Sequence, residues 1–158
     1  WFELTGDPDS NERAFRSFNC ATFSSLENGL VKTSVDEGTG YWVSDGYGDY
    51  MRHFQRGMAS VPEWAPPGEP HLLSSTSMVR RIRYGVDEIA YVTFDAAARE
   101  VLRLPRAPTR VRAGSRTLAR VDDLDSSAEG YTVRLSNGGG VVLSIRHGRS
   151  GHIRIVFK

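Results

Sequence analysis

The chain of 158 residues has one cysteine, only two lysines and no long hydrophobic run. Cys20 has no second cysteine to pair with inside the chain, so a disulfide scaffold is excluded. No stretch reaches the ~18 to 20 apolar residues of a membrane-spanning helix, and no segment has the charged-then-apolar order of a signal peptide. We therefore expect no membrane partner. A chain of this length can bury a hydrophobic core without staples.

Charge is balanced over the whole chain but not along it. Residues 1–70 hold five basic and 11 acidic side chains, whereas residues 71–158 hold 15 and eight, so the two parts carry net charges of −6 and +7. A basic half can indicate nucleic-acid binding. However, the arginines are scattered, and the longest basic run is Arg80-Arg81. We therefore expect no nucleic-acid partner and favour complementary docking of the two halves.

The first 60 residues have the periodicity of helices. Apolar residues recur at helical spacing over about residues 8–25, and again from about residue 45 or 48 to residue 60. Residues 1–5 resemble the end of a helix that Gly6 terminates. Because a free helix of five residues could not meet its nucleation cost, we expect the chain to be a fragment of a longer protein.

A change of pattern follows four prolines between residues 62 and 70. Beyond them hydrophobicity alternates with a period of two, and Gly-, Asn- and Ser-containing turns separate seven or eight short stretches. Because one flat sheet of this size would leave a face unburied, we expect a β-sandwich. The predicted fold is α+β, with a helical segment at 1–61, a Pro-rich linker at 62–71 and an antiparallel sandwich at 72–158.

Residues 41–54 form the densest cluster of aromatic and polar side chains. Sugar rings stack on aromatic faces while their hydroxyls bond carboxylates, arginine and histidine, so this composition indicates carbohydrate binding. A structural alternative is that an aspartate caps the helix and the rings pack between helices. In the linker, one tryptophan either fills an interface or forms a ligand rim with Glu63 and His71. The candidate carbohydrate-binding residues are Tyr41, Trp42, Asp45, Tyr47, Asp49, His53 and Trp64.

Other reactive residue types do not form a known motif. The four histidines and Cys20 lack zinc-site spacing, so we expect no metal, and no sequence motif calls for a cofactor. His147 and His152 flank a turn and are expected at solvated strand ends, while Cys20 is expected to be a small buried residue. The serines at 74, 75 and 77 match no nucleophile elbow. The sequence assigns no catalytic residue.

Several segments together carry a resemblance to a known family. They are WFELTGDP at 1–8, ERAFRSFN at 12–19, YW at 41–42, DGYGDY at 45–50 and VPEWAP at 61–66, followed by VLRL at 101–104, EGY at 129–131 and IRH at 145–147. This combination resembles the C-terminal end of bacterial six-hairpin glycosidase-like proteins, whose chains end with a β-sandwich.

The resemblance implies that residues 1–60 are the last helices of an (α/α)₆ toroid and that an accessory sandwich follows. Enzymes with that toroid act on polysaccharides or oligosaccharides through carboxylates on loops at one end of the barrel. No residue here matches a family acid or base, so Asp45, Tyr47 and Asp49 are carried over only as members of a cleft rim.

The implied partners are a poly- or oligosaccharide and the missing N-terminal part of the same chain. Secretion or a periplasmic location would suit such a protein, but the sequence fixes neither, and it leaves open whether the chain is itself an enzyme. We expect a noncatalytic C-terminal portion that braces the toroid. The alternatives are a free-standing carbohydrate-binding module that stacks sugar on Trp42, Tyr47 or Trp64, and an arginine-lined adaptor with salt-dependent binding.

Overall fold

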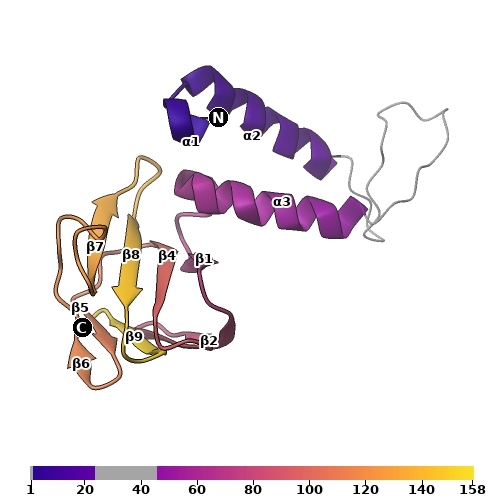
Figure 1. Ribbon diagram of the computed structural model, residues 1–158. Coiled ribbons are helices and arrows are strands. Elements are labelled where there is room, and N and C mark those ends of the chain that lie inside the picture. The colour runs from indigo at the N-terminus through magenta and orange to yellow at the C-terminus, as the bar shows by residue number, and fades with distance from the viewer. Residues whose placement is uncertain (1, 24–45) are drawn as a thin grey trace, which may run out of the picture. The chain divides into compact units, whose positions relative to one another are not determined.

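The computed structural model describes residues 2–23 and 46–158, with side chains for residues 4–20 and 52–158. The chain divides into two compact units, Trp1–Ser60 and Val61–Lys158 (Figure 1). The described helices of more than one turn lie in the first unit, and two antiparallel sheets form the second. The fold is therefore α+β, with helices followed by a β-sandwich, as the sequence predicts.

The helical unit contains α1 (Phe2–Thr5), α2 (Pro8–Phe23) and α3 (Gly46–Ser60). Gly6, at φ 69°, separates α1 from α2, because this left-handed conformation suits glycine at a helix end. The Asp7 carboxylate accepts the Asp9 amide proton at 3.2 Å and caps α2, with Pro8 in its first turn. Phe18 of α2 packs edge-to-face on Phe54 of α3, with ring centroids 5.8 Å apart.

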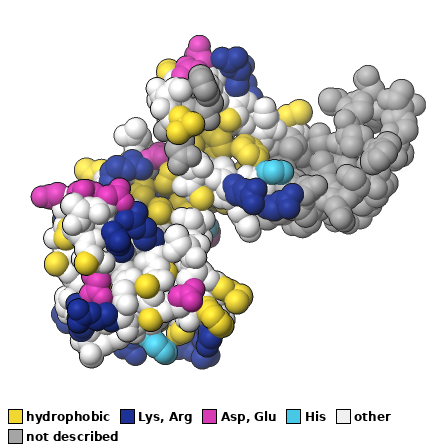
Figure 2. Space-filling view, in the orientation of Figure 1, with side chains coloured by type: hydrophobic (Ala, Val, Ile, Leu, Met, Phe, Trp, Pro, Cys, Tyr) yellow, Lys and Arg dark blue, Asp and Glu magenta, His cyan; other side chains and the backbone are white. Residues whose placement is uncertain are grey.

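Hydrophobic side chains gather over α2 and α3 in Figure 2. Phe15 nevertheless remains 42% exposed. The prediction for Cys20 was wrong, because the structure places this residue at an exposed position of α2. Its position follows from helix geometry, since residues two positions apart, such as Phe18 and Cys20, lie on different faces.

The sandwich consists of two antiparallel sheets. The four-stranded sheet has the order β1-β4-β8-β7, and the five-stranded sheet has the order β2-β3-β9-β5-β6. The strands are β1 (His71–Ser75), β2 (Val79–Tyr84), β3 (Glu88–Thr93), β4 (Ala98–Leu104), β5 (Arg110–Ala113), β6 (Arg116–Thr117), β7 (Gly130–Leu135), β8 (Val141–His147) and β9 (His152–Val156).

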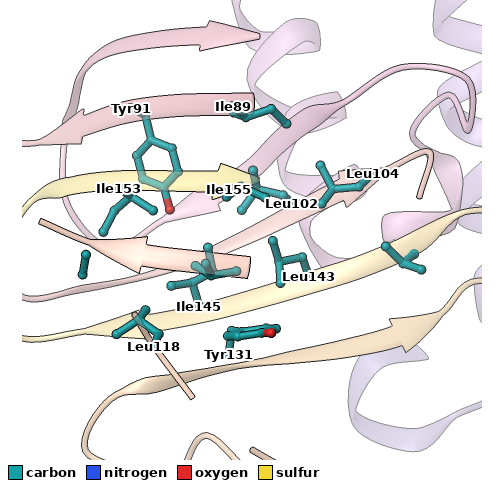
Figure 3. Packing of buried hydrophobic residues seen from close by; sticks show 13 residues of the cluster. Ile89, Tyr91, Leu102, Leu104, Leu118, Tyr131, Leu143, Ile145, Ile153 and Ile155 are labelled. Atoms are coloured by element: carbon teal, nitrogen blue, oxygen red, sulfur yellow. The ribbon is translucent and has the colours of Figure 1, made fainter. Parts of the chain in front are cut away.

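The core lies between the two sheets. Alternate residues along each strand point inward, so the period of two in the sequence supplies both inner faces. Figure 3 shows these side chains gathered in one layer between the strands. Its members are Ile89, Tyr91, Leu102, Leu104, Val111, Ala113, Leu118, Tyr131, Val141, Leu143, Ile145, Ile153 and Ile155.

The segment before β1 is part of the sandwich unit. Pro62–Trp64 forms a single 3₁₀ turn, η1, where irregular structure is predicted, because proline is tolerated in the first turn of a helix. Arg103, on the outer side of β4, is fully buried. It donates to the Gly139 carbonyl and, at 3.4 Å, to the Val141 carbonyl. Arg103 thus points away from the core and is still shielded from solvent.

Candidate functional site

The predicted carbohydrate-binding residues fall into three groups. Tyr41, Trp42 and Asp45 lie outside the described residues, as do the side chains of Tyr47 and Asp49 at the beginning of α3. The side chains that the structure does describe are those of His53, which is exposed on α3, and Trp64, which is half-buried in η1. The joint site stays a prediction.

Glu63, next to Trp64, has a defined structural partner. Its Oε1 accepts from Arg134 Nη1 at 2.9 Å and from Ser136 Oγ at 3.4 Å. Partial burial would raise the pKa of the Glu63 carboxyl, but the hydrogen bond and charge of Arg134 outweigh burial and lower it. Glu63 therefore fastens η1 to β7 as a carboxylate. The other proposed rim residue, His71, is half-buried at the beginning of β1.

A buried polar cluster lies at one edge of the core. Glu100 of β4 accepts from Tyr91 Oη at 3.1 Å on Oε2, and from Ser75 Oγ at 3.3 Å on Oε1. His147 Nε2 lies 3.1 Å from Glu100 Oε1, and both side chains are fully shielded from solvent. The prediction that His147 is solvated was therefore wrong. The residue ends β8 in sequence, but its side chain points inward beside Ala98 and Ile145 in the strand register.

The hydrogen-bond pattern fixes where the proton lies on His147. Nδ1 is 2.8 Å from the Ala96 carbonyl oxygen, which can only accept, so Nδ1 carries a hydrogen. Nε2 and Glu100 Oε1 therefore share a second proton. Burial would lower the pKa of the His147 imidazole, but the hydrogen bond and charge of Glu100 outweigh it and raise the pKa. The raised pKa favours the protonated form of His147 in this pair.

This cluster holds the sheets together and does not present a reactive group. Tyr91 comes from the five-stranded sheet, and Glu100 and His147 come from the four-stranded sheet, so the carboxylate joins the two. Burial, followed by the charge of Glu100, raises the pKa of the Tyr91 hydroxyl well above its usual value. Because the side chains of Glu100 and His147 are fully shielded from solvent, a substrate cannot reach their reactive atoms. We assign the cluster a structural role.

An open hollow of about 350 Å³ lies on the outer side of the four-stranded sheet, beneath the loop at 122–125. Arg99 Nη2 pairs with Asp125 Oδ1 at 2.7 Å, and Arg146 Nη1 donates to the Leu124 carbonyl at 3.0 Å, so two strand arginines hold the loop. We call this site the loop hollow. Its lining includes Arg99, Asp122, Asp123, Asp125, Thr132 and Ser144.

The loop conformation is set by Asp123. Its carboxylate accepts the amide protons of Asp125 at 2.8 Å and Ser126 at 3.2 Å. These bonds, the Asp125 bond first, lower the pKa of the Asp123 carboxyl. The loop hollow therefore combines carboxylates, a guanidinium and two strand hydroxyls, which are the groups that bind sugar hydroxyls.

Sequence reasoning did not single out the loop hollow, because its residues come from β4, β7, β8 and a loop that are distant in the chain. Only the run of aspartates at 122–125 could have drawn attention to it. Among the described residues, no group of three or more His, Cys, Asp or Glu side chains is arranged to hold a metal ion. None of the described helices has the length and apolar character required to cross a membrane.

Comparison with models of protein families, with curated proteins and with solved structures finds no match to this chain.

Proposed function

We propose that this chain is the C-terminal, noncatalytic portion of a carbohydrate-active, glycoside-hydrolase-like protein. In this proposal the helical unit completes an (α/α)₆ toroid, and the sandwich braces the toroid and borders its sugar cleft. The observation that supports it most is the order of the two units, with amphipathic helices followed directly by an antiparallel sandwich. The same order underlies the resemblance to six-hairpin glycosidase-like proteins.

The connection into the sandwich suits a bracing role. Val61 and Ala65 are buried, and Glu63 is bonded to Arg134 and Ser136. The chain therefore enters β1 from a segment that is already fixed on the sandwich. A brace has to be attached in this way, because a flexible linker would transmit little stability.

The test uses the complete reading frame that contains this chain, assayed for release of reducing sugars from a panel of neutral and acidic polysaccharides. Deletion of residues 72–158 is expected to lower both the activity and the melting temperature of the remaining protein. A truncated protein of unchanged activity and stability would refute bracing. Release of no sugar by the complete protein from any member of the panel would refute the carbohydrate assignment.

The loop hollow favours a second candidate function, a free-standing carbohydrate-binding module. Asp122 and the hydroxyls of Thr132 and Ser144 line an open hollow of about 350 Å³. This volume lies just above the lower limit of ~300 Å³ for pockets that bind small ligands. A module of this kind binds sugar without cleaving it. Binding would then survive in this chain alone.

Substitutions in the loop hollow test this second candidate. Thr132→Val with Ser144→Val is expected to weaken binding of a neutral oligosaccharide at least about tenfold if the hollow is the site, because each lost hydrogen bond leaves a partner unsatisfied. Thr117→Val with Ser115→Ala, at exposed positions of the β5–β6 hairpin in the other sheet, is the control. Equal binding by both double variants would exclude the loop hollow.

A further inference from the structure

The outer side of the five-stranded sheet carries a basic trough along β3. In the strand register, Ala90 of β3 lies between Arg83 of β2 and Arg154 of β9. One step along, Val92 lies between Arg81 and His152. Small side chains on the middle strand are thus flanked on both sides by long cationic or protonatable ones. The resulting hollow has a volume of about 280 Å³.

The dimensions of the trough follow from strand geometry. Residues two apart on one strand are separated by ~6.7 Å, and β2 and β9 are two strand spacings, or ~9.6 Å, apart. Arg81, Arg83, His152 and Arg154 therefore stand at the corners of a rectangle of about that size around the Ala90–Val92 floor. The side chains from β2 and from β9 form the two walls of the trough. Two anionic groups on one ligand can therefore each be contacted from both walls.

The charge of the trough is little compensated. Arg154 lies 3.8 Å from Glu88, and this pair is largely exposed. In the part of the chain that the structure describes, no ion pair joins Arg81 or Arg83 to a carboxylate, although both are exposed. In addition, Arg112 of β5 stands directly opposite Arg154. Like charges opposite one another destabilise a sheet, so an anionic ligand would relieve this repulsion.

We propose that this trough binds an acidic polysaccharide whose sugar rings carry carboxylate groups. Arginine binds a carboxylate through two parallel N–H···O bonds, and the side chains of Ala90 and Val92 leave room for a sugar ring between the walls. The inference rests on the proposed carbohydrate function and adds to it the charge class of the polymer.

The floor of the trough distinguishes this ligand from a single-stranded nucleic acid. Proteins that bind single strands combine a basic groove with aromatic rings on which bases stack. Here the outward-facing β3 residues of the lining are Glu88, Ala90 and Val92, and none of them is aromatic. The aromatic residue between Ala90 and Val92, Tyr91, points into the core, where its hydroxyl bonds Glu100. The observations therefore favour an anionic polymer without bases.

The experiment measures binding of this chain to polygalacturonate by affinity electrophoresis and titration calorimetry. Fully methyl-esterified polygalacturonate, which has the same rings without the charge, serves as the ligand control. We expect binding of the acid form alone, and weakening as NaCl is raised from about 50 to about 300 mM, because salt screens exposed charges. Binding of both polymers with equal affinity would overturn the proposal.

Two double variants locate the site. Arg81→Gln with Arg83→Gln is expected to weaken polygalacturonate binding at least about tenfold, because two charge-assisted contacts are lost. Arg120→Gln with Arg149→Gln removes the same net charge at exposed positions outside the trough and is expected to change affinity less than about twofold. Equal losses in the two variants would overturn the proposal, because they would mean attraction by net charge alone.

A third variant tests the shape of the trough without changing charge. Ala90→Trp fills the floor between Arg83 and Arg154 and is expected to block binding while leaving the melting temperature close to that of the parent chain. Unchanged binding would overturn the proposal. So would an oligothymidylate that binds more tightly than polygalacturonate and is displaced from the same arginines.

The result also separates this inference from the proposed function. If the complete protein releases sugar from a neutral polysaccharide while this chain does not bind polygalacturonate, only the trough assignment fails. If the complete protein acts on no polysaccharide but the trough variants still lose polygalacturonate binding, the proposed function fails and the trough assignment stands.

Discussion

The two sheets of the sandwich differ in how their outer faces are used. In the four-stranded sheet, Arg103 and Val142 are buried although they point away from the core, because η1 and the turn at 136–140 lie against this side. In the five-stranded sheet, β9 alternates between buried Ile153 and Ile155 and exposed His152 and Arg154. The four-stranded sheet is thus covered on its inner face and on part of its outer face. The five-stranded sheet is covered on its inner face.

This difference separates stability from binding. An arginine on the covered side is desolvated, so its hydrogen bonds to carbonyls are required by the fold. An arginine on the open side has water as a partner and can exchange it for a ligand. Figure 2 shows Lys and Arg side chains at several separate places over the sandwich. Surface charge alone therefore does not distinguish arginines that the fold requires from arginines that are open to a ligand.

The largest expected effect comes from removing the carboxylate that joins the sheets. Glu100→Ala leaves the His147 imidazolium and the Tyr91 hydroxyl buried without their partner. We expect it to lower the free energy of unfolding by about 3–5 kcal/mol in urea titrations. Glu88→Ala, on the open face, is the matched control, and its exposed pair with Arg154 predicts a loss of ~0.2–1 kcal/mol.

A similar loss in the two variants would contradict the distinction between the sheets. Glu100→Leu combined with His147→Leu is expected to recover much of the stability that Glu100→Ala loses, because replacing both members of a buried pair removes the uncompensated charge. A double variant as unstable as Glu100→Ala would mean that the site depends on shape, not on charge.

The next effect concerns the turn that covers Arg103. Gly140 has φ 65°, and a Cβ atom there would overlap the Leu104 carbonyl oxygen. Gly139 also has a positive φ of 84°, but space around it is open. Gly140→Ala is expected to cost about 2–4 kcal/mol and Gly139→Ala about 1 kcal/mol, measured by urea unfolding. Equal costs would show that backbone strain alone, without the steric overlap, sets the result.

A smaller effect is expected from pH. Because the folded state raises the pKa of His147 above its ordinary value of 6.5, the stabilisation is fully present below that pH and is lost as pH rises through the folded pKa. Unfolding midpoints measured from pH 6 upward should therefore fall with pH at the alkaline end. His147→Gln should flatten this part of the profile. An identical profile in the variant would assign the dependence to another group.

The fold was predictable to the extent that it depends on periodicity. The alternation over 101–104 and 153–157 places Leu102, Leu104, Ile153 and Ile155 in the core, because a strand of period two has one inner face. The short β1 was not anticipated, because its sequence HLLSS does not alternate and its register shifts between Leu72 and Ser74.

Burial of polar residues could not be predicted in the same way. Glu100 and His147 stabilise each other across 47 residues of sequence, so neither position looks apolar when the chain is read alone. Likewise, the loop hollow and the trough arise from registers between strands, whereas the sequence shows only dispersed serines, aspartates and arginines. The candidate residues at 41–49 were chosen because they are adjacent in sequence, and their side chains lie outside those described.

The smallest expected effect has the opposite sign and sharpens the contrast between the faces. Arg154 stands opposite Arg112, and its contact with Glu88 is long and exposed. Arg154→Thr relieves the like-charge pair and places a residue of high β-propensity on the strand. We expect the free energy of unfolding to rise by up to ~0.5 kcal/mol at low ionic strength, and the gain to shrink in high salt. A loss of stability that persists in salt would mean that the Arg154 side chain stabilises the fold by packing. A gain would mean that the open face keeps a destabilising charge, as expected where arginines serve a ligand.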